Sequence, residues 1–451
     1  MKPADGTIKK SPKPVLGVIA RCVLAFVLCL ALLFGLLCLT SLIPVSAIRE
    51  HIAASAVLMD TQEGDFYYRR PGDARTIIHD YADAVYLNLL LHIDGDGLLK
   101  EVIAAPLYAD ETGMTQTGSL RRSVEQDPAP NAMYDRYWHG MLLLLRPLLV
   151  VTDISGVRVC ITVLLLGLLA ALCVLLWLRG QRDLSVLLVL CAALIRFPML
   201  GLCVEYSPTW LVGLGFAIAA VFLDKASEAS LAVLFVLCGV CTAFFDFLTT
   251  ETAALLLPLI VLLCLRQKEG RLRSFRDGLR LCALAGLAWL LSYAAAFAAK
   301  WLLAEAVLGG GRIADAVSQA VYRQGFRLEL ASDVPQPVLA VAANLQALVS
   351  SASSLNSGAV LSVFAGVLVL LGALVYLFRK TGEQPALSLL LYLLAFLPLL
   401  RFAVLNSHSM THTFFTYRAL FSTVLCLLLA TWRITSFGQF RSSRPKRGKK
   451  K

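Results

Sequence analysis

The sequence predicts an all-α protein, a polytopic transmembrane bundle of about ten helices with a large loop containing surface helices between the first two spans. Of the 451 residues, 58% are hydrophobic and only 16% are charged, whereas roughly a quarter of a soluble domain is charged. The mean hydropathy is +0.73. Apolar stretches of about 20 residues, which cross ~30 Å of hydrocarbon as a helix, recur along the chain. A soluble enzyme, a disordered chain and a secreted disulfide scaffold are therefore excluded.

The chain divides into five parts. Residues 1–14 form a basic leader, and residues 15–43 form the first transmembrane helix, whose apolar run exceeds the roughly 7 to 15 residues of a cleavable signal peptide. Residues 44–155 form a polar loop, residues 156–432 contain about nine further spans, and residues 433–451 form a basic tail. Hydropathy predicts the spans at 15–43, 156–178, 184–204, 209–223, 230–248, 252–265, 281–303, 359–378, 386–405 and 413–432.

Two segments of the loop have the pattern of amphipathic helices. ARTIIHDYADAVYLNLLLH at residues 74–92 carries apolar residues at helical spacing on one side, with Asp80, Asp83 and Asn88 elsewhere. Residues 141–151 lie just before the second span and show a similar pattern. We expect both segments to form helices that lie on the membrane surface.

Basic residues gather on one side of the predicted bundle. With ten spans, the termini and the connections on their side carry about 23 basic and 7 acidic residues, whereas residues 44–155 carry about 16 acidic and 9 basic ones. The positive-inside rule therefore predicts that both termini are cytoplasmic and that the loop is extracytoplasmic. The net charge of +11 reflects this topology and attraction to anionic lipid, and no nucleic acid is needed to explain it.

Ionisable residues within the spans lie mostly toward the loop side. A charge at mid-helix costs roughly 2.5 to 3.5 kcal/mol on insertion scales, so a cluster at one depth predicts a polar cavity open to the outer leaflet. Snorkelling to the interface is the alternative for those close to a helix end. The residues are Arg158, Arg196, Glu205, Asp246, Glu251, Lys300, Arg401 and Arg418.

The segment NSHSMTHTFFTYR is a candidate anion site. His408 and His412 share a helical face, and Arg418 follows them. Two histidines at this spacing could bind a metal, but the Glu of HExxH and a third ligand are missing. We therefore predict a row of donors for an anionic group such as a lipid phosphate, and no protein-bound metal site. A polar patch that only caps the helix is the alternative.

Two further groups could contact a substrate. Asp80 and Asp83 lie three residues apart, and such a pair at the edge of an apolar site could include one carboxylate with a raised pKa that accepts a proton from a hydroxyl. A solvated pair is the alternative. YDRYWHG offers aromatic rings beside hydrogen-bonding groups, which suits the C–H faces and hydroxyls of a sugar, although aromatic residues also anchor membrane interfaces. Its candidate residues are Tyr134, Tyr137, Trp138 and His139.

Taken together, these features resemble the GT-C superfamily of polytopic glycosyltransferases. The resemblance rests on the uncleaved first helix, the large outer loop with its acidic pair, and the cationic belt of the later spans. One departure is that Asp80 follows the first helix by about 37 residues, whereas the acidic motif of that superfamily follows closely. The segments YDRYWHGMLLLLRPLL, FFDFLTTE and NSHSMTHTFFTYRAL are also similar to segments of bacterial integral membrane proteins.

The resemblance implies a bacterial plasma-membrane enzyme that moves a sugar from a polyprenyl-phosphate donor to an envelope acceptor at the outer face. Asp83 or Asp80 would be the base, and a divalent metal is possible but not required. The residues implied to bind the donor phosphate are Arg196, Arg401, His408, His412 and Arg418. A transporter or lipid flippase, or a non-catalytic envelope assembly protein, are the alternatives. The donor sugar, the acceptor and the oligomeric state are not predicted.

Overall fold

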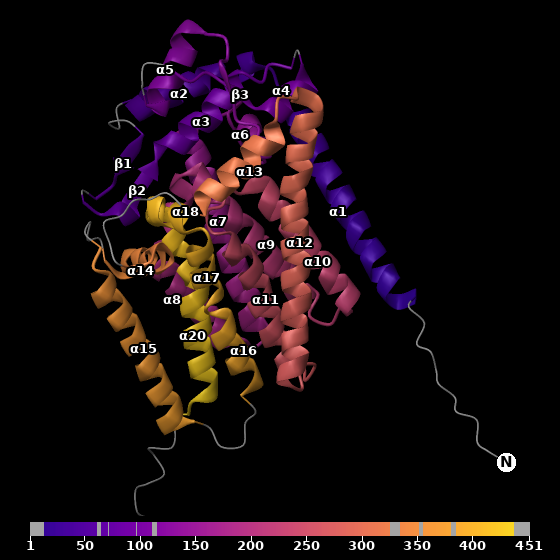
Figure 1. The fold of residues 1–451 in the computed structure, drawn as a ribbon, viewed down its shortest axis with the longest axis vertical. Helices are drawn as coiled ribbons and strands as arrows, with labels where there is room; N and C mark the ends of the chain where they lie inside the picture. Colours follow the sequence, from indigo (N-terminus) through magenta and orange to yellow (C-terminus); the bar gives the residue numbers. More distant parts are fainter. Residues whose placement is uncertain are drawn as a thin grey trace, which may run out of the picture.

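The computed structural model describes residues 13–60, 65–70, 72–95, 97–110, 115–324, 334–350, 355–379 and 385–436. Long helices form a bundle, and the chain between the first two of them caps one end (Figure 1). We call this end the loop end. The described chain begins and finishes at the opposite end, which we call the terminal end (Figure 1).

The bundle is built from long helices joined by short connections. Its elements are α1 (Lys13–Thr40), α7 (Ile154–Leu178), α8 (Arg182–Leu194), α9 (Pro208–Phe222), α10 (Glu228–Phe245), α11 (Glu251–Lys268), α12 (Phe275–Leu308), α15 (Ser357–Phe378), α16 (Ala386–Leu394), α17 (Leu397–Val404) and α20 (Leu420–Ile434).

Shorter elements build the loop end. They are α2 (Arg49–Asp60), α3 (Asp80–Leu91), α4 (Leu98–Ala104), α5 (Gln116–Gln126), α6 (Leu142–Leu148), α13 (Arg312–Arg323), α14 (Gln336–Val349), α18 (Asn406–Thr411), α19 (Thr413–Thr416) and the 3-10 turns η1 (Val45–Ala47), η2 (Ala74–Thr76), η3 (Phe197–Leu202), η4 (Val204–Tyr206) and η5 (Tyr417–Ala419). Two antiparallel hairpins pair β1 (Phe66–Tyr68) with β2 (Ile77–His79) and β3 (Pro106–Leu107) with β4 (Ala132–Met133).

Eight helical segments of the described chain are long and apolar enough to cross a membrane, so the protein is an integral membrane protein. The prediction of about ten spans differs at two places. The segment predicted at 184–204 forms α8, which has only 13 residues. It stops because Arg196 takes a left-handed conformation (φ 56°) and is followed by a 3-10 turn that has Pro198 as its second residue. The segment predicted at 252–265 forms α11, which is not among the eight because it carries three charged residues, Glu251 at its start and two basic residues at its end.

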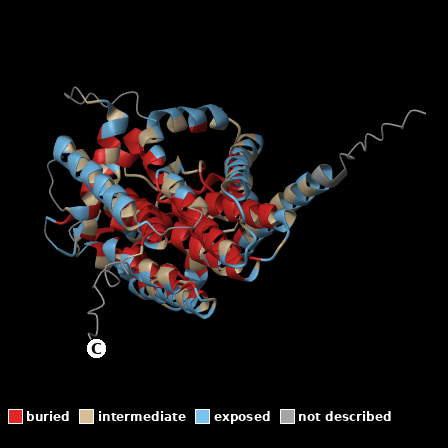
Figure 2. Ribbon diagram, turned by 90° about the horizontal axis from the view of Figure 1, so that it is seen from below, coloured by how far each residue is buried: buried red, intermediate tan, exposed pale blue. Residues whose placement is uncertain are grey.

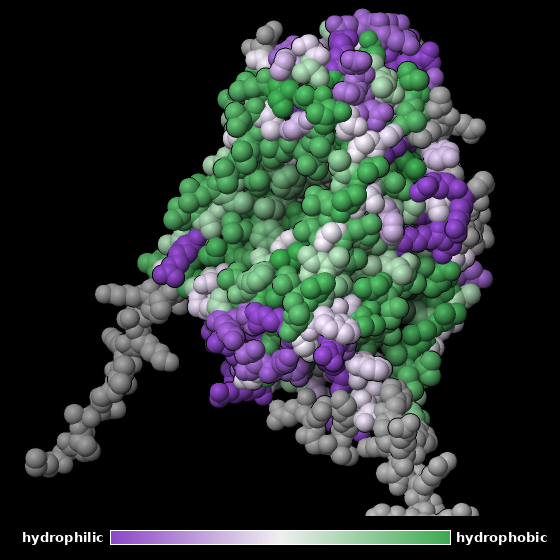
Figure 3. All heavy atoms as spheres, turned by 180° about the vertical axis from the view of Figure 1, so that it is seen from behind, coloured by the Kyte–Doolittle hydropathy of each residue, from purple (hydrophilic) through white to green (hydrophobic). Residues whose placement is uncertain are grey.

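Helix α11 is nevertheless the centre of the bundle. Every residue from Glu251 to Arg266 is buried, as expected for a helix that is apolar on all sides. Figure 2 shows the buried residues gathered in the middle of the bundle and the exposed ones around it. By contrast, α1 projects from the bundle, and no residue of α15 is buried. Their apolar side chains contribute to a hydrophobic belt that lies between two polar ends (Figure 3).

The first predicted surface helix of the loop is instead packed into the cap. All residues of α3 except Tyr81 are buried, whereas α6 buries one side only, with Leu142, Leu145 and Arg146. A helix with carboxylates can be buried on every side only when each polar group finds a partner. In α3, Asn88 donates to the Tyr108 carbonyl (2.8 Å) and accepts from the Tyr108 amide (3.2 Å). The partners of the two aspartates are described below.

Helix α12 joins the cap to the bundle. Its 34 residues are about 51 Å long at 1.5 Å per residue, well beyond a hydrocarbon thickness of ~30 Å. Its last turns therefore lie beside the cap, where Lys300 donates to the Ile103 carbonyl of α4 (2.6 Å) and Trp301 donates to the Arg136 carbonyl (3.2 Å). These contacts hold the cap against the loop end of the bundle.

Candidate functional site

A carboxylate cluster, made of Asp80, Asp83 and Arg158, lies where α3 meets α7. Asp83 accepts from Arg158 Nε (2.9 Å) and Nη2 (2.7 Å), and its other oxygen accepts from the Val204 amide (2.9 Å). Asp80 Oδ1 also accepts from the Arg158 guanidinium. Both carboxylates are fully buried, so the predicted acidic pair is neither solvated nor free.

The two aspartates of this cluster differ in one respect. Both oxygens of Asp83 have partners, whereas Asp80 Oδ2 is buried without a partner among the described residues. Burial raises the pKa of Asp80 to about 6, although the charge of Arg158 opposes this effect. Burial also raises the pKa of Asp83. Asp80 is therefore the member of the pair that has an oxygen available to accept a proton near neutral pH.

Arg418 is the second feature of the site. It is 1% exposed, and its guanidinium donates to the carbonyls of Phe414 (3.0 Å) and Arg75 (3.5 Å) while Nε has no partner. The ring of Tyr206 lies 4.6 Å from its Cζ. Within the described part of the chain, no carboxylate forms an ion pair with it. A buried charge without a counter-ion is costly, so this position favours an anionic ligand.

Cys203 lies within electrostatic reach of both the carboxylate cluster and Arg418. Burial raises the pKa of the Cys203 thiol, Asp83 raises it further, and both Arg158 and Arg418 lower it. Cys203 also accepts a hydrogen bond from the His79 amide (2.9 Å). The chain around Cys203 therefore separates the two groups and touches both.

A histidine–carboxylate pair completes this side of the site and was not predicted as a functional pair. His79 Nδ1 and Glu205 Oε2 lie 2.5 Å apart, and the His79 ring is stacked between Phe66 (4.9 Å) and Tyr81 (5.5 Å). The hairpin of β1 and β2 places Phe66 opposite His79. A partner 126 residues away carries no local sequence signal. The only indication was the position of Glu205 near a predicted helix end.

The predicted donors Arg401, His408 and His412 lie together but differ from Arg418. Arg401 forms a two-point ion pair with Glu251 (2.8 and 3.3 Å) and donates to Ser409 Oγ (2.9 Å), so its charge is balanced. The rings of His408 and His412 are 4.7 Å apart. Burial lowers the pKa of His412 to about 4 and lowers that of His408 as well. Both histidines are therefore neutral hydrogen-bonding groups near pH 7.

The remaining cation of the predicted set, Arg196, is also paired with a carboxylate. It forms an ion pair with Asp73 (2.9 Å), which is held in turn by Arg75 (2.8 Å). The carbonyl of Arg75 accepts the hydrogen bond from Arg418. Arg196 therefore supports the chain that touches Arg418, and it shares the single negative charge of Asp73 with Arg75.

The predicted aromatic residues form a cluster around Phe247, in which Tyr137 and His139 are buried and Tyr134 and Phe247 are half-buried. Tyr137 (4.7 Å) and His139 (5.3 Å) lie against its ring, and Tyr134 is close (6.1 Å). Burial lowers the pKa of His139 to about 3, and its Nε2 lies 2.5 Å from the Tyr134 carbonyl. Trp138 points elsewhere and donates to the Ala296 carbonyl (2.9 Å). We call Tyr134, Tyr137, His139 and Phe247 the aromatic cluster.

The turn between α10 and α11 presents Phe247 to this cluster. Asp246 accepts from the Thr249 amide (3.0 Å) and hydroxyl, and Leu248 takes a left-handed conformation (φ 65°) that is strained for leucine. Burial raises the pKa of Asp246 to about 7, and the nearby charge of Glu251 raises it further. Asp246 is thus a second buried carboxyl group that titrates near neutral pH.

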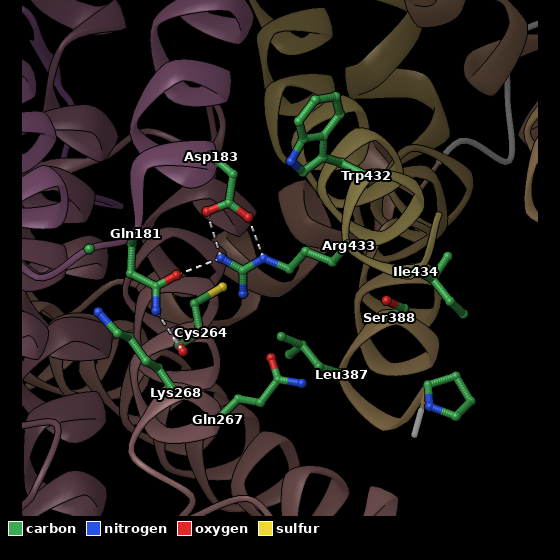
Figure 4. Close-up of a pocket in the computed structure, with 12 residues that line it drawn as sticks. Gln181, Asp183, Cys264, Gln267, Lys268, Leu387, Ser388, Trp432, Arg433 and Ile434 are labelled. Carbon is green, nitrogen blue, oxygen red and sulfur yellow. Dashed lines mark hydrogen bonds and ion pairs between the residues drawn. The ribbon is translucent and has the colours of Figure 1, made fainter. Parts of the chain in front are cut away.

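Four surface cavities of 310 to 760 Å³ lie outside these groups, so the predicted open polar cavity is not among them. One of about 630 Å³ lies at the terminal end (Figure 4). There Asp183 (2.6 and 3.0 Å) and Gln181 (2.5 Å) point at the Arg433 guanidinium and satisfy it. In the described ranges, no three His, Cys, Asp or Glu residues are grouped to hold a metal ion.

The carboxylate cluster, Arg418 and the aromatic cluster come from segments far apart in sequence, and all three lie at the loop end of the bundle. Carboxyl groups that titrate near pH 7, an uncompensated arginine and buried aromatic rings are typical of sites that bind an anion beside a polar substrate. No family model, curated protein or solved structure matches this chain, so its chemistry has to be inferred from the geometry of the site.

Proposed function

We propose that this integral membrane protein is a GT-C-like glycosyltransferase, which moves a sugar from a polyprenyl-phosphate donor to an envelope acceptor at the loop end. The observation that carries the proposal is the buried charge of Arg418, which no described carboxylate balances. Guanidinium groups bind phosphate through charge-assisted hydrogen bonds. A cation at the boundary between an apolar bundle and a polar cap suits a phosphate attached to a hydrocarbon chain. A polyprenyl phosphate has this form.

In this proposal Asp80 is the general base. Its free Oδ2 takes the proton of the acceptor hydroxyl, and the acceptor oxygen forms a bond to the anomeric carbon of the sugar. The bond between that carbon and the phosphate oxygen breaks, and polyprenyl phosphate leaves with the electron pair. Arg418 neutralises the charge that grows on the phosphate. Asp83 positions Asp80 through their shared partner, Arg158.

The test is transfer of a labelled sugar by the purified protein in lipid vesicles that contain polyprenyl-phosphate-linked sugar. We expect Asp80→Asn and Arg418→Gln each to reduce transfer at least about a hundredfold, as loss of one catalytic proton transfer or one charge contact does. Arg276→Gln removes an exposed arginine at the terminal end and is the matched control. It should transfer sugar at the wild-type rate.

The same vesicles separate the alternatives. Movement of the labelled donor between leaflets without transfer would favour a lipid flippase. Neither transfer nor movement would favour a non-catalytic envelope assembly protein. Either result would overturn the proposal if the panel of donors covers hexoses, aminosugars and pentoses.

A further inference from the structure

A second arginine without a carboxylate partner lies at the edge of the site. Arg323, the last residue of α13, is half-buried, and its Cζ lies 5.5 Å from the centre of the Tyr137 ring. In the described ranges it forms no ion pair. Burial lowers the pKa of His412 and of His408, and the charge of Arg323 contributes to the lowering of both. Arg323 therefore lies between the aromatic cluster and the two histidines.

Helix α13, which carries Arg323, is attached by weak contacts. Arg136 forms an ion pair with Asp315 (3.2 Å) and Arg312 forms one with Asp135 (3.4 Å). Three of these four side chains are 28 to 47% exposed, and ion pairs of this kind contribute little. Ala316 is the only buried residue of the helix. At its start, the amides of Gly311 and Ile313 also donate to the Glu305 carboxylate (3.2 Å each), so among the described residues α13 is held mainly by polar contacts.

Helix α13 has a charged side and an apolar side. Its charged residues face the cap, whereas its larger apolar side chains are exposed. Those side chains are Ile313, Val317, Val321 and Tyr322. A surface helix of a soluble protein buries its apolar side, whereas a helix at a membrane interface turns that side to lipid and its polar side to the protein or to water. A polar inner face is appropriate if this face covers a polar ligand.

A run of three glycines precedes the helix. Gly309, Gly310 and Gly311 are consecutive, and all three have left-handed backbone conformations (φ +66°, +82° and +80°). A Cβ atom at Gly309 or Gly311 would meet no atom within 4 Å, so steric crowding does not explain these glycines. Backbone freedom does, because glycine alone adopts this region readily. At the other end, the Gln324 carbonyl accepts from Asn406 Nδ2 (2.7 Å), close to His408.

We propose that α13 is a hinged strap that closes over the bound donor and places Arg323 against its phosphate, opposite Arg418. This inference rests on the proposed function, because it requires a phosphate at Arg418. It adds a second binding residue and a moving part. Tyr137 holds the Arg323 guanidinium ready while the strap is open.

The first test is equilibrium binding of undecaprenyl phosphate to the full-length protein in detergent. Loss of a hydrogen bond to a charged group costs about tenfold or more in affinity. Arg323→Gln should therefore raise Kd about tenfold, and Arg323→Lys should recover part of the loss. Arg276→Gln should bind as the wild type does. Wild-type affinity in Arg323→Gln would overturn the inference.

The second test is hydrogen exchange of the amides of residues 312–323, with and without undecaprenyl phosphate. Closure predicts slower exchange on binding in the wild type and no change in Arg418→Gln. Unchanged exchange in a wild type that binds the lipid would overturn the strap alone. Absence of binding by the wild type would overturn both the strap and the proposed function. Binding that depends on Arg323, without sugar transfer, would support the strap and contradict the proposed transferase activity.

Discussion

Replacing Arg158 with glutamine tests the carboxylate cluster most sharply, because one guanidinium holds two buried carboxylates. Asp80 and Asp83 are both 0% exposed, and their hydrogen bonds to Arg158 would be lost together. Removing one partner of a buried ion pair costs about 3–5 kcal/mol. At about 2 °C per kcal/mol, the melting temperature in detergent should fall by roughly 6–10 °C at neutral pH.

The loss of stability caused by Arg158→Gln should be smaller at acidic pH than at neutral pH. Burial raises the pKa of folded Asp80 from its ordinary value of 3.8 to about 6, so the folded protein binds this proton more tightly than the unfolded chain. The stability from this group is present below pH 3.8 and is lost as the pH rises through about 6, by about 3 kcal/mol in all. Without Arg158 the pKa rises further, so Arg158→Gln should be less destabilising near pH 5 than near pH 7.5.

Two controls make this result interpretable. The triple variant with Asp80→Asn, Asp83→Asn and Arg158→Gln removes all three charges and should recover most of the lost melting temperature. Arg276→Gln should melt as the wild type does. A melting temperature for Arg158→Gln within about 1 °C of wild type at neutral pH would refute the reasoning, because surface substitutions alone change stability that little.

Three further predictions follow from single buried positions, each read out as a melting temperature in detergent. Gly239→Ala should lower it by several degrees, because its Cβ would lie 2.4 Å from the Trp289 carbonyl oxygen and force α10 from α12, whereas Gly286→Ala meets no atom within 4 Å and should leave it unchanged. Asn344→Leu should cost about 1–3 kcal/mol, because it removes hydrogen bonds of 2.9 and 2.7 Å to α18 and α19. Burial raises the pKa of Asp246 to about 7, so wild-type stability should fall as the pH rises through 7. Asp246→Asn should abolish that fall.

The sequence was a good guide to the bundle and a poorer guide to the cap. Apolar runs predict the long helices because lipid requires every backbone group to be paired within a helix. The same pattern predicted a helix over residues 74–92, and α3 spans Asp80–Leu91. Its burial on all sides depends on Arg158, which is 75 residues beyond Asp83. Neither amphipathicity nor spacing reveals so distant a counter-ion.

The candidate site was likewise predicted only in part. One-sided placement of charges drew attention to Arg418, Arg401 and Arg196, which all lie at the loop end. Which of them lacks a counter-ion depends on contacts between distant segments, such as the ion pair between Arg401 and Glu251, 150 residues apart. The contacts of α13 with the cap could not be predicted, because its charged residues meet Asp135 and Arg136 only after the chain has folded.

Binding of undecaprenyl phosphate to the purified protein is the measurement that tests the central claim most directly. The phosphate should recognise Arg418, so the wild type should bind undecaprenyl phosphate and should not bind undecaprenol, which has the same chain without the charge. Arg418→Gln should weaken binding about ten- to a hundredfold, the value of a hydrogen bond to a charged group. Equal affinity of the wild type and Arg418→Gln, or equal affinity for the phosphate and the alcohol, would contradict the account.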